Sequence, residues 1–241
     1  MQQRVEADST EEDTLWTIAK ELLGIESVPR NYAEKLISTS GAFIAIIAVY
    51  FSATVLMPPK AAMLIVASMG ATAMLLFALP HAAVSQPWPV FGGQVISALI
   101  GVFISHHVAN PLLAAPLAVA LCTLIQFFGR CLHPPGAATA LTAVFASEGL
   151  REMGYSFALA PVALNVLVLL IIAFLFNLPF KTRRYPSGWH KRSTTPIAIG
   201  HADVAVSHED FVKAVEQLDT FIDVSEDDLI RLHNLIYHKQ H

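Results

Sequence analysis

Residues 36–180 form a stretch of 145 residues with only five charged side chains: Lys60, Arg130, Glu148, Arg151 and Glu152. Soluble domains usually carry about one charged residue in four, so a block this long and this apolar cannot provide the surface of a soluble fold. At roughly 20 residues per helical crossing, it has room for several spans. The stretch predicts an all-α, polytopic membrane protein whose first partner is the lipid bilayer.

Turn residues and polar clusters divide this stretch into six apolar segments. They are Leu36–Met57, Ala61–Leu79, Phe91–Ala109, Leu112–Gly129, His133–Ser147 and Phe157–Leu178. Five are 18–22 residues long, whereas the fifth has 15. As a helix the fifth rises only about 22 Å against a hydrocarbon core of about 30 Å. It must either re-enter the membrane or cross it with its start, a short half-helix, sunk below the membrane surface.

Lys and Arg residues near the segment ends favour one of these topologies. With six crossings and a cytoplasmic N-terminus, six lie inside (Arg30, Lys35, Arg130, Lys181, Arg183, Arg184) and two outside (Lys60, Arg151). A re-entrant fifth segment makes the count four against four. We therefore expect six spans with both termini in the cytoplasm. The first 30 residues show no cleavable signal, and the simplest address is the plasma (inner) membrane of a bacterium.

A short internal similarity indicates how the spans are arranged. Residues 58–64 (PPKAAML) open the second segment, and residues 134–141 (PPGAATAL) open the fifth. Each follows one complete segment, so the block reads as three spans plus three. An odd number of spans per repeat gives the inverted-repeat plan of many transporters. Small residues are common in membranes, so a chance match is the alternative.

The chain divides into four regions. We expect residues 1–35 to form an N-terminal cytoplasmic segment with a short amphipathic helix over 10–24, and residues 36–180 to form the transmembrane domain. Residues 181–200 contain many turn-forming residues and predict a linker. Residues 201–241 hold two helix starts, near Ser207 and Ser225, which predict a cytoplasmic helical hairpin.

The most specific local motif is His133-Pro134-Pro135-Gly136, at the start of the fifth segment. Two prolines suit the first turn of a helix, where a missing N–H costs nothing. A helix that begins here would direct free N–H groups and its positive dipole end at an anion. Gly136 and Ala137 would leave those donors uncovered, Thr139 would add a hydroxyl, and His133 could couple a proton. The alternative is a helix cap that packs tightly in a crowded bundle.

Other small and polar residues extend this candidate substrate site: Ser68, Gly70, Ala71, Thr72, Gly93, Gln94 and Asn165. Gly70, among small hydroxylated residues, can break the second segment and create a second helix start. Close helix packing through Ser68 and Thr72, four residues apart, is the alternative. The amides of Gln94 and Asn165 either line a pathway or bond neighbouring helices together.

Charges and absent motifs narrow the function further. Arg130 inside and Lys60 outside would attract an anion, or act only as topology signals. No Asp or Glu occurs between Leu36 and Ser147, which disfavours cation carriers because these usually hold a carboxylate in the membrane. A net charge of −4 without a basic face excludes nucleic acid as a partner. No catalytic set or metal-ligand spacing stands out, so we expect no enzyme activity, no cofactor and no metal site.

Two longer stretches resemble a known family. Residues 67–102 (ASMGATAMLLFALPHAAVSQPWPVFGGQVISALIGV) and 130–144 (RCLHPPGAATALTAV) are similar, in order and spacing, to the HPP family of integral membrane proteins. The resemblance covers about residues 30–180, and the family is usually described with four spans, fewer than the six expected above. Residues 221–229 (FIDVSEDDL) resemble the segment that joins the membrane part to CBS domains in longer members.

The resemblance implies a function that agrees with the residue chemistry. Plant chloroplast and cyanobacterial members are described as nitrite transporters, and nitrite is a small anion. We therefore expect a transporter or channel for a small inorganic anion, with a homodimer as an arrangement that the sequence leaves open. The alternative is a non-transporting membrane anchor or adaptor whose C-terminal hairpin docks a partner.

Overall fold

The computed structural model describes residues 16, 19, 22, 23, 32–56, 59–146, 148–180 and 183–189. All regular structure within these residues is helical, which confirms the predicted helical class. The hairpin expected over 201–241 and most of the segment 1–35 lie outside the described residues.

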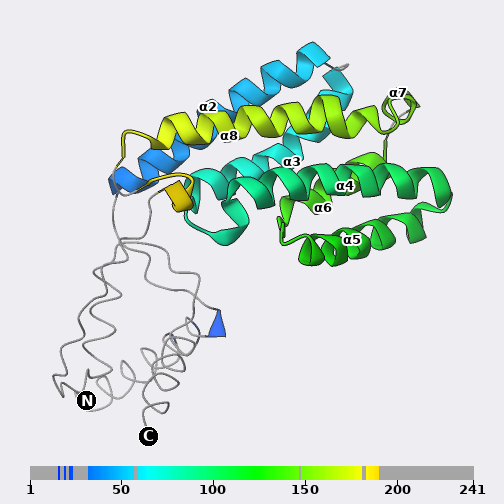
Figure 1. The fold of residues 1–241 in the computed structure, drawn as a ribbon, viewed down its shortest axis with the longest axis horizontal. Helices are drawn as coiled ribbons and strands as arrows, with labels where there is room; N and C mark the ends of the chain where they lie inside the picture. Colours follow the sequence, from blue (N-terminus) through cyan, green and yellow to red (C-terminus); the bar gives the residue numbers. More distant parts are fainter. Residues whose placement is uncertain are drawn as a thin grey trace, which may run out of the picture. The chain divides into compact units, whose positions relative to one another are not determined.

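Six helical segments follow one another at the positions expected from the sequence (Figure 1). They are α2 (Tyr32–Leu56), α3 (Pro59–Ala78), α4 (Pro87–His107), α5 (Pro111–Phe128), α6 (Pro135–Val144), and α8 (Leu164–Asn177) with the preceding π-helical turn η2 (Ala158–Ala163). Short elements connect them: η1 (Ala83–Ser85), α7 (Glu148–Glu152) and, after α8, η3 (Ser187–Trp189).

Prolines explain where four of these helices begin. Pro59, Pro87, Pro111 and Pro135 each occupy the first helical position, where the N–H has no partner in the helix and the fixed φ of proline already suits it. Pro161 lies inside η2. A proline there has no N–H to donate to the residue one turn earlier, which accounts for the local change from α-helical to wider π-helical bonding.

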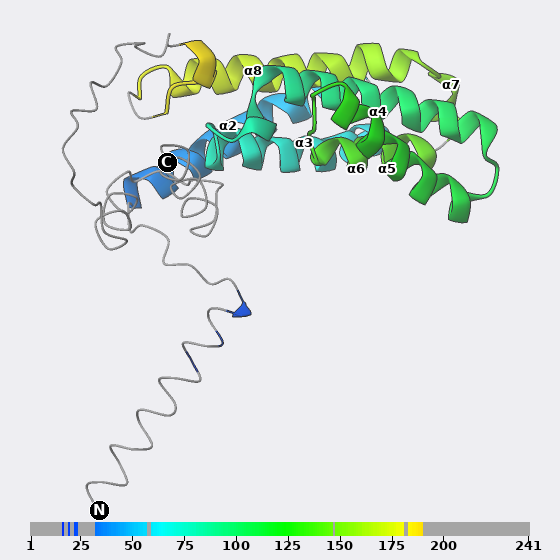
Figure 2. The same cartoon turned by 60° about the horizontal axis from the view of Figure 1, so that its bottom comes forward.

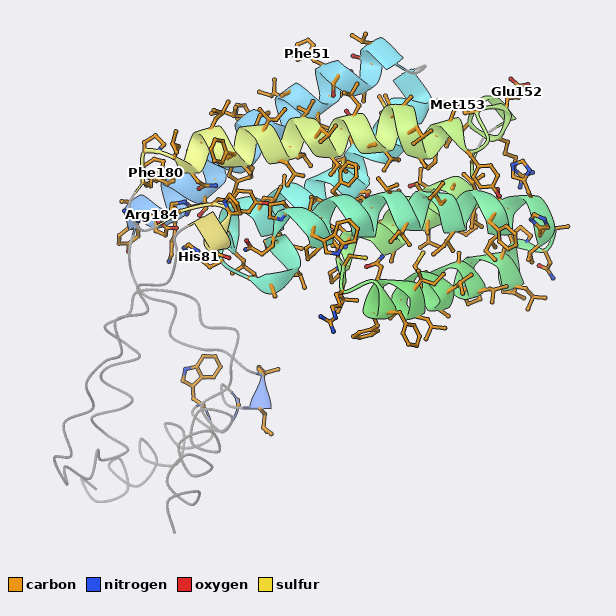
Figure 3. All side chains as sticks on the ribbon, in the orientation of Figure 1. Phe51, His81, Glu152, Met153, Phe180 and Arg184 are labelled. Atoms are coloured by element: carbon orange, nitrogen blue, oxygen red, sulfur yellow. The ribbon has the colours of Figure 1, made fainter. Side chains whose placement is uncertain are left out.

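Four of the helical segments are long and apolar enough to cross a membrane: Tyr32–Val55, Pro87–His107, Pro111–Phe128 and Ala158–Asn177. In α3 the apolar part is the shorter Val66–Ala78, and α6 has 10 residues where the sequence predicted 15. Large apolar side chains cover the outside, as Phe51 does on α2, pointing away from the other helices (Figure 3). The chain is therefore a multi-pass membrane protein.

Helix α4 lies at the centre of the bundle. Of the 18 residues in its most apolar window, 56% are buried, against 22% in α2 and in α5. Figures 1 and 2 show α8 along one side of α4 and α5 along the other, with α6 packed against α4. Side chains on α4 therefore reach all the neighbouring helices.

Glycines on α4 allow α6 to approach closely. A Cβ on Gly101 would lie 2.5 Å from the carbonyl oxygen and 2.8 Å from the Cα of Ala140. A Cβ on Gly93 would lie 2.6 Å from the Cβ of His133. With Ser97 between them, these residues recur every four positions and form one small-residue face, the usual means of close helix packing in membranes.

Helix α3 is continuous through Gly70. The expectation that Gly70 breaks this segment and creates a second helix start is therefore wrong. Gly70 is only half-buried and Ala71 is exposed, whereas Ser68 and Thr72 are buried on the side of the helix opposite Gly70. A single glycine costs a helix only about 1 kcal/mol, which packing of the buried face offsets.

A pair of alanine substitutions tests the close approach of α4 and α6. We expect Gly101→Ala to cost about 1–3 kcal/mol, because its Cβ meets rigid backbone. Gly70→Ala should leave stability unchanged or raise it slightly, because no heavy atom lies within 4 Å of its Cβ. The measurement is the thermal unfolding midpoint of each variant in detergent. Equal midpoints would contradict the packing described here.

Candidate functional site

Five polar side chains from α3, α4, α6 and the turn before α6 meet in the interior of the bundle. They are Ser68, Thr72, Gln94, His133 and Thr139, each at most 2% exposed, and we call them the polar layer. All five were predicted as site residues from the sequence, and the structure brings them together. Buried polar groups cost free energy unless they are hydrogen-bonded, so their bonds decide what the layer can do.

Gln94 lies at the centre of the polar layer. Its Nε2 donates to Thr72 Oγ1 at 2.8 Å, and its Oε1 accepts a hydrogen bond from Thr139. The Ser68 hydroxyl lies 2.5 Å from Thr139 Oγ1 and 3.1 Å from the Pro135 carbonyl, to which it can donate. The amide of α4 thus connects α3 to α6 through hydroxyl groups.

His133 closes one end of this network. Its Nδ1 lies 2.8 Å from the Val84 carbonyl oxygen and its Nε2 lies 2.9 Å from Thr72 Oγ1. A carbonyl can only accept, so in the neutral ring Nδ1 carries the proton and Nε2 accepts from the Thr72 hydroxyl. The hydrogen bonds therefore assign a single tautomer to His133.

Gln126 on α5 holds the turn that precedes α6. This residue was not among the site residues predicted from the sequence. Its Oε1 accepts from the backbone N–H of His133 at 2.7 Å, and its Nε2 donates to Ser97 Oγ at 2.8 Å. The residue is 3% exposed. The available signal was an amide within an apolar helix, seven residues before His133.

The start of α6 differs from the expected anion site. Pro134 and Pro135 have no N–H, and the next two N–H groups are already used: Gly136 donates to the His133 carbonyl at 2.9 Å and Ala137 to the Pro134 carbonyl at 3.1 Å. The prediction that Gly136 and Ala137 leave free donors is therefore wrong. A Cβ on Gly136 would lie 2.5 Å from Ser97 Oγ, so this glycine permits close packing, the alternative considered from the sequence.

The remaining predicted site residues lie outside the polar layer. Asn165 on α8 accepts a hydrogen bond from Ser52 on α2, and its buried Nδ2 has no partner among the described residues. Arg130 is exposed in the turn between α5 and α6, with a φ of +50°. Lys60 lies in the first turn of α3, and its side chain is outside the described part.

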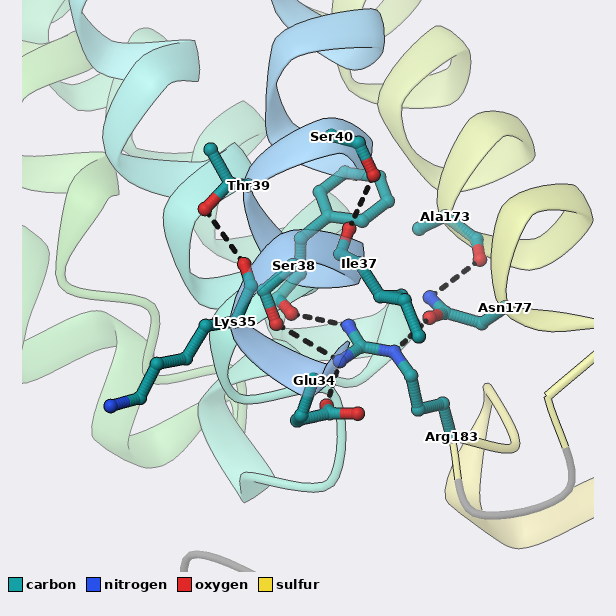
Figure 4. A network of polar contacts seen from close by, with 10 residues as sticks. Glu34, Lys35, Ile37, Ser38, Thr39, Ser40, Ala173, Asn177 and Arg183 are labelled. Atoms are coloured by element: carbon teal, nitrogen blue, oxygen red, sulfur yellow. Dashed lines mark hydrogen bonds and ion pairs between the residues drawn. The ribbon is translucent and has the colours of Figure 1, made fainter. Parts of the chain in front are cut away.

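A second polar network lies at the end of α8 (Figure 4). Arg183, whose side chain is 2% exposed, forms an ion pair with Glu34 and donates to the Phe77 carbonyl. It also donates to Ser38 Oγ and to Asn177 Oδ1, each at 3.0 Å. Burial lowers the pKa of the Arg183 guanidinium, and the Glu34 carboxylate opposes that shift.

Part of the segment that was predicted as a linker contacts the bundle. Residues 181–200 were predicted as a linker, and within them Arg183, Tyr185 and Ser187 bond to the bundle. Tyr185 is buried and its hydroxyl donates to the Ser85 carbonyl at 2.9 Å, and the N–H of Ser187 donates to Gln86 Oε1 at 3.0 Å. In the sequence, Arg183 is part of a basic cluster that follows a span, and such a cluster is also typical of a topology signal.

Removal of the Gln126 amide tests its role at the turn. We expect Gln126→Leu to cost about 1–3 kcal/mol, because the His133 N–H and the Ser97 hydroxyl lose their partner in a buried place. Thr123→Val, on the exposed face of the same helix, breaks only a bond to its own helix at Val119. The thermal midpoint in detergent distinguishes the two variants. A drop no larger than that of Thr123→Val would count against the assigned role.

Comparison with known proteins gives a family match. A model of the family described as HPP, transmembrane region, matches residues 27–186, which confirms the resemblance found in the sequence. Two transmembrane proteins of Dictyostelium discoideum are each 33% identical to this chain. The matches cover 129 residues (52% of this chain, 45% of the relative) and 134 residues (54% and 43%). The matched part is thus less than half the length of these relatives. No solved structure matches the chain.

Proposed function

Because the chain belongs to the HPP transmembrane-region family, we propose that it carries a small inorganic anion, with nitrite as the first candidate, across the membrane. The observation that carries the proposal is the polar layer: three hydroxyls, an amide and an imidazole, all buried and joined by hydrogen bonds inside the bundle.

The chemistry of the polar layer suits an anion. The layer contains donors and no carboxylate, and the sequence has no Asp or Glu between Leu36 and Ser147. The hydroxyls of Ser68, Thr72 and Thr139 can rotate, so each can turn its proton from a protein partner toward an anion. A hydrogen bond to a charged acceptor is roughly twice as strong as a neutral one. An entering anion therefore competes well for these donors.

The short α6 places part of the site at membrane depth. Its 10 residues rise about 15 Å, half of a hydrocarbon core of about 30 Å. Irregular backbone at such a depth is tolerated where protein covers it, and Gln126 and Ser97 cover the turn before α6. In this proposal the binding site lies near the midplane, between Arg130 inside and Lys60 outside.

We also propose six crossings arranged as inverted repeats of three. Support comes from six helical segments at the expected positions and from the proline starts of α3 and α6, two helices whose hydroxyls meet at Ser68 and Thr139. The six-against-two distribution of positive charge supports a cytoplasmic location for both termini. For a bacterial cell this corresponds to the inner membrane.

Two matched substitutions on α6 test the substrate site. Thr139→Val removes a hydroxyl of the polar layer and keeps the side-chain shape. Thr142→Val removes a hydroxyl that bonds only the Ala138 carbonyl of its own helix. One hydrogen bond to a charged group contributes about 1.5–3 kcal/mol. We therefore expect Thr139→Val to reduce nitrite uptake about tenfold or more, and Thr142→Val to keep it.

The measurement is nitrite uptake into proteoliposomes, with nitrate, formate and chloride as competitors. Saturable uptake that competitors reduce supports an anion transporter. Saturable uptake that Thr139→Val leaves unchanged would remove the polar layer from the mechanism. Folded protein without flux of any of these anions would favour the membrane anchor, whose hairpin docks a partner.

A further inference from the structure

The segment after α8 contacts the loop between α3 and α4. We call residues 183–189 the strap. Tyr185 of the strap donates to the Ser85 carbonyl at 2.9 Å, and the Ser187 N–H donates to Gln86 Oε1 at 3.0 Å. Arg183 donates to the carbonyl of Phe77, in the last turn of α3. The strap is therefore bonded both to the last turn of α3 and to the turn that leads into α4.

The same loop also contacts the polar layer. The carbonyl of Val84, the residue before Ser85, accepts the Nδ1–H of His133 at 2.8 Å. Both residues belong to η1, a single tight turn of three residues. The strap and His133 thus bind consecutive carbonyl groups of one turn, and a displacement of that turn would move both acceptors.

Other side-chain hydrogen bonds also involve this turn and the loop around it. Ser85 Oγ donates to the Leu75 carbonyl at 3.2 Å, and Gln86 Nε2 donates to the carbonyls of Pro80 and Ala82 at 3.0 and 3.1 Å. The Gln86 bonds stay within the loop and so do not fix its position against the bundle. Tyr185 and Ser187 therefore add two hydrogen bonds to this loop from outside it.

We propose that Tyr185 and Arg183 are positioning residues for His133. They hold η1 so that the Val84 carbonyl keeps the imidazole proton on Nδ1 and leaves Nε2 to accept from Thr72. This inference adds detail to the proposed anion site, and its importance for transport rests on that proposed function. The structural link itself can be measured without any transport.

The tautomer of His133 matters because it sets the direction of hydrogen bonds in the polar layer. With the proton on Nδ1, the Thr72 hydroxyl donates to His133 and accepts from Gln94 Nε2. With the proton on Nε2, His133 donates instead, and the Thr72 proton turns to the Ser68 carbonyl, now 3.3 Å away. The strap would thus decide which hydroxyl protons the layer can offer to an anion.

Tyr185 is suited to a fixed role of this kind. It is 4% exposed, and burial raises the pKa of its hydroxyl, so the group stays a donor at any physiological pH. Arg183 anchors the start of the strap through four partners from three helices: Glu34 and Ser38 of α2, Phe77 of α3 and Asn177 of α8. Removal of one phenol oxygen should therefore loosen η1 without releasing the strap.

The test is the ¹⁵N spectrum of the full chain in detergent, labelled at histidine, with the His133 signals assigned by their loss in His133→Gln. We expect the wild type to show one neutral tautomer protonated on Nδ1. Tyr185→Phe should shift the His133 signals toward a mixture of both tautomers. Tyr50→Phe removes a phenol oxygen from an exposed residue of α2 and should leave the His133 signals unchanged.

A second variant keeps the inference testable if Tyr185→Phe does not fold. Arg183→Lys keeps the positive charge beside Glu34, but an ammonium cannot reach Phe77 and Asn177 together as a guanidinium does. It should move the His133 signals in the same direction. Unchanged His133 signals in a folded strap variant would overturn the inference, even if the wild type transports nitrite. Shifted signals in a protein without anion flux would support the inference and overturn the proposed function.

Discussion

The hydrogen bond from the His133 backbone N–H to the Gln126 side chain joins the parts on which the site depends. It ties α5 to the turn before α6, and the same amide reaches Ser97 on α4. In an apolar bundle these groups cannot hydrogen-bond to water, so each needs a partner within the protein. The Gln126 amide therefore holds the His133 end of the turn, and the ring of His133 is bonded to the Val84 carbonyl and to Thr72. The polar layer has a defined geometry because hydrogen bonds hold both the backbone N–H and the imidazole ring of His133.

Close packing and polarity depend on each other here. Gly101 brings α4 so near to α6, and Gly93 brings it so near to the turn before α6, that a Cβ at either position would collide with these neighbours. Only at that separation can Gln94 reach Thr139 and, on its other side, Thr72. Larger residues on this face would separate the helices and leave the amide and the hydroxyls without partners. The small residues thus stabilise the bundle mainly because they let the helices come close enough for Gln94 and the hydroxyl groups to form hydrogen bonds.

The sequence predicted what depends on local chemistry. Prolines marked the starts of α3 and α6, and low charge located the membrane domain. Ser68, Thr72, Gln94, His133 and Thr139 were all identified as candidate site residues. It could not predict what depends on tertiary contacts. An amide such as Gln126 has the same local pattern whether it bonds a loop or a helix. A small polar run around Gly70 fits a broken helix and a continuous packed one equally well. Arg183 counted as a topology charge because its partner Glu34 lies 149 positions away.

The two polar networks place charge differently. The Arg183–Glu34 ion pair lies where Glu34 is still 38% exposed, so the carboxylate keeps part of its hydration and the cost of burying the pair is reduced. The polar layer has neutral hydroxyl and amide groups, which cost less to bury than ions. In the proposed transport this division has a consequence. A fixed cation in the layer would hold an anion strongly, whereas neutral donors compensate its lost water without a full counter-charge. Binding can then be strong enough for entry and weak enough for release, which conduction requires.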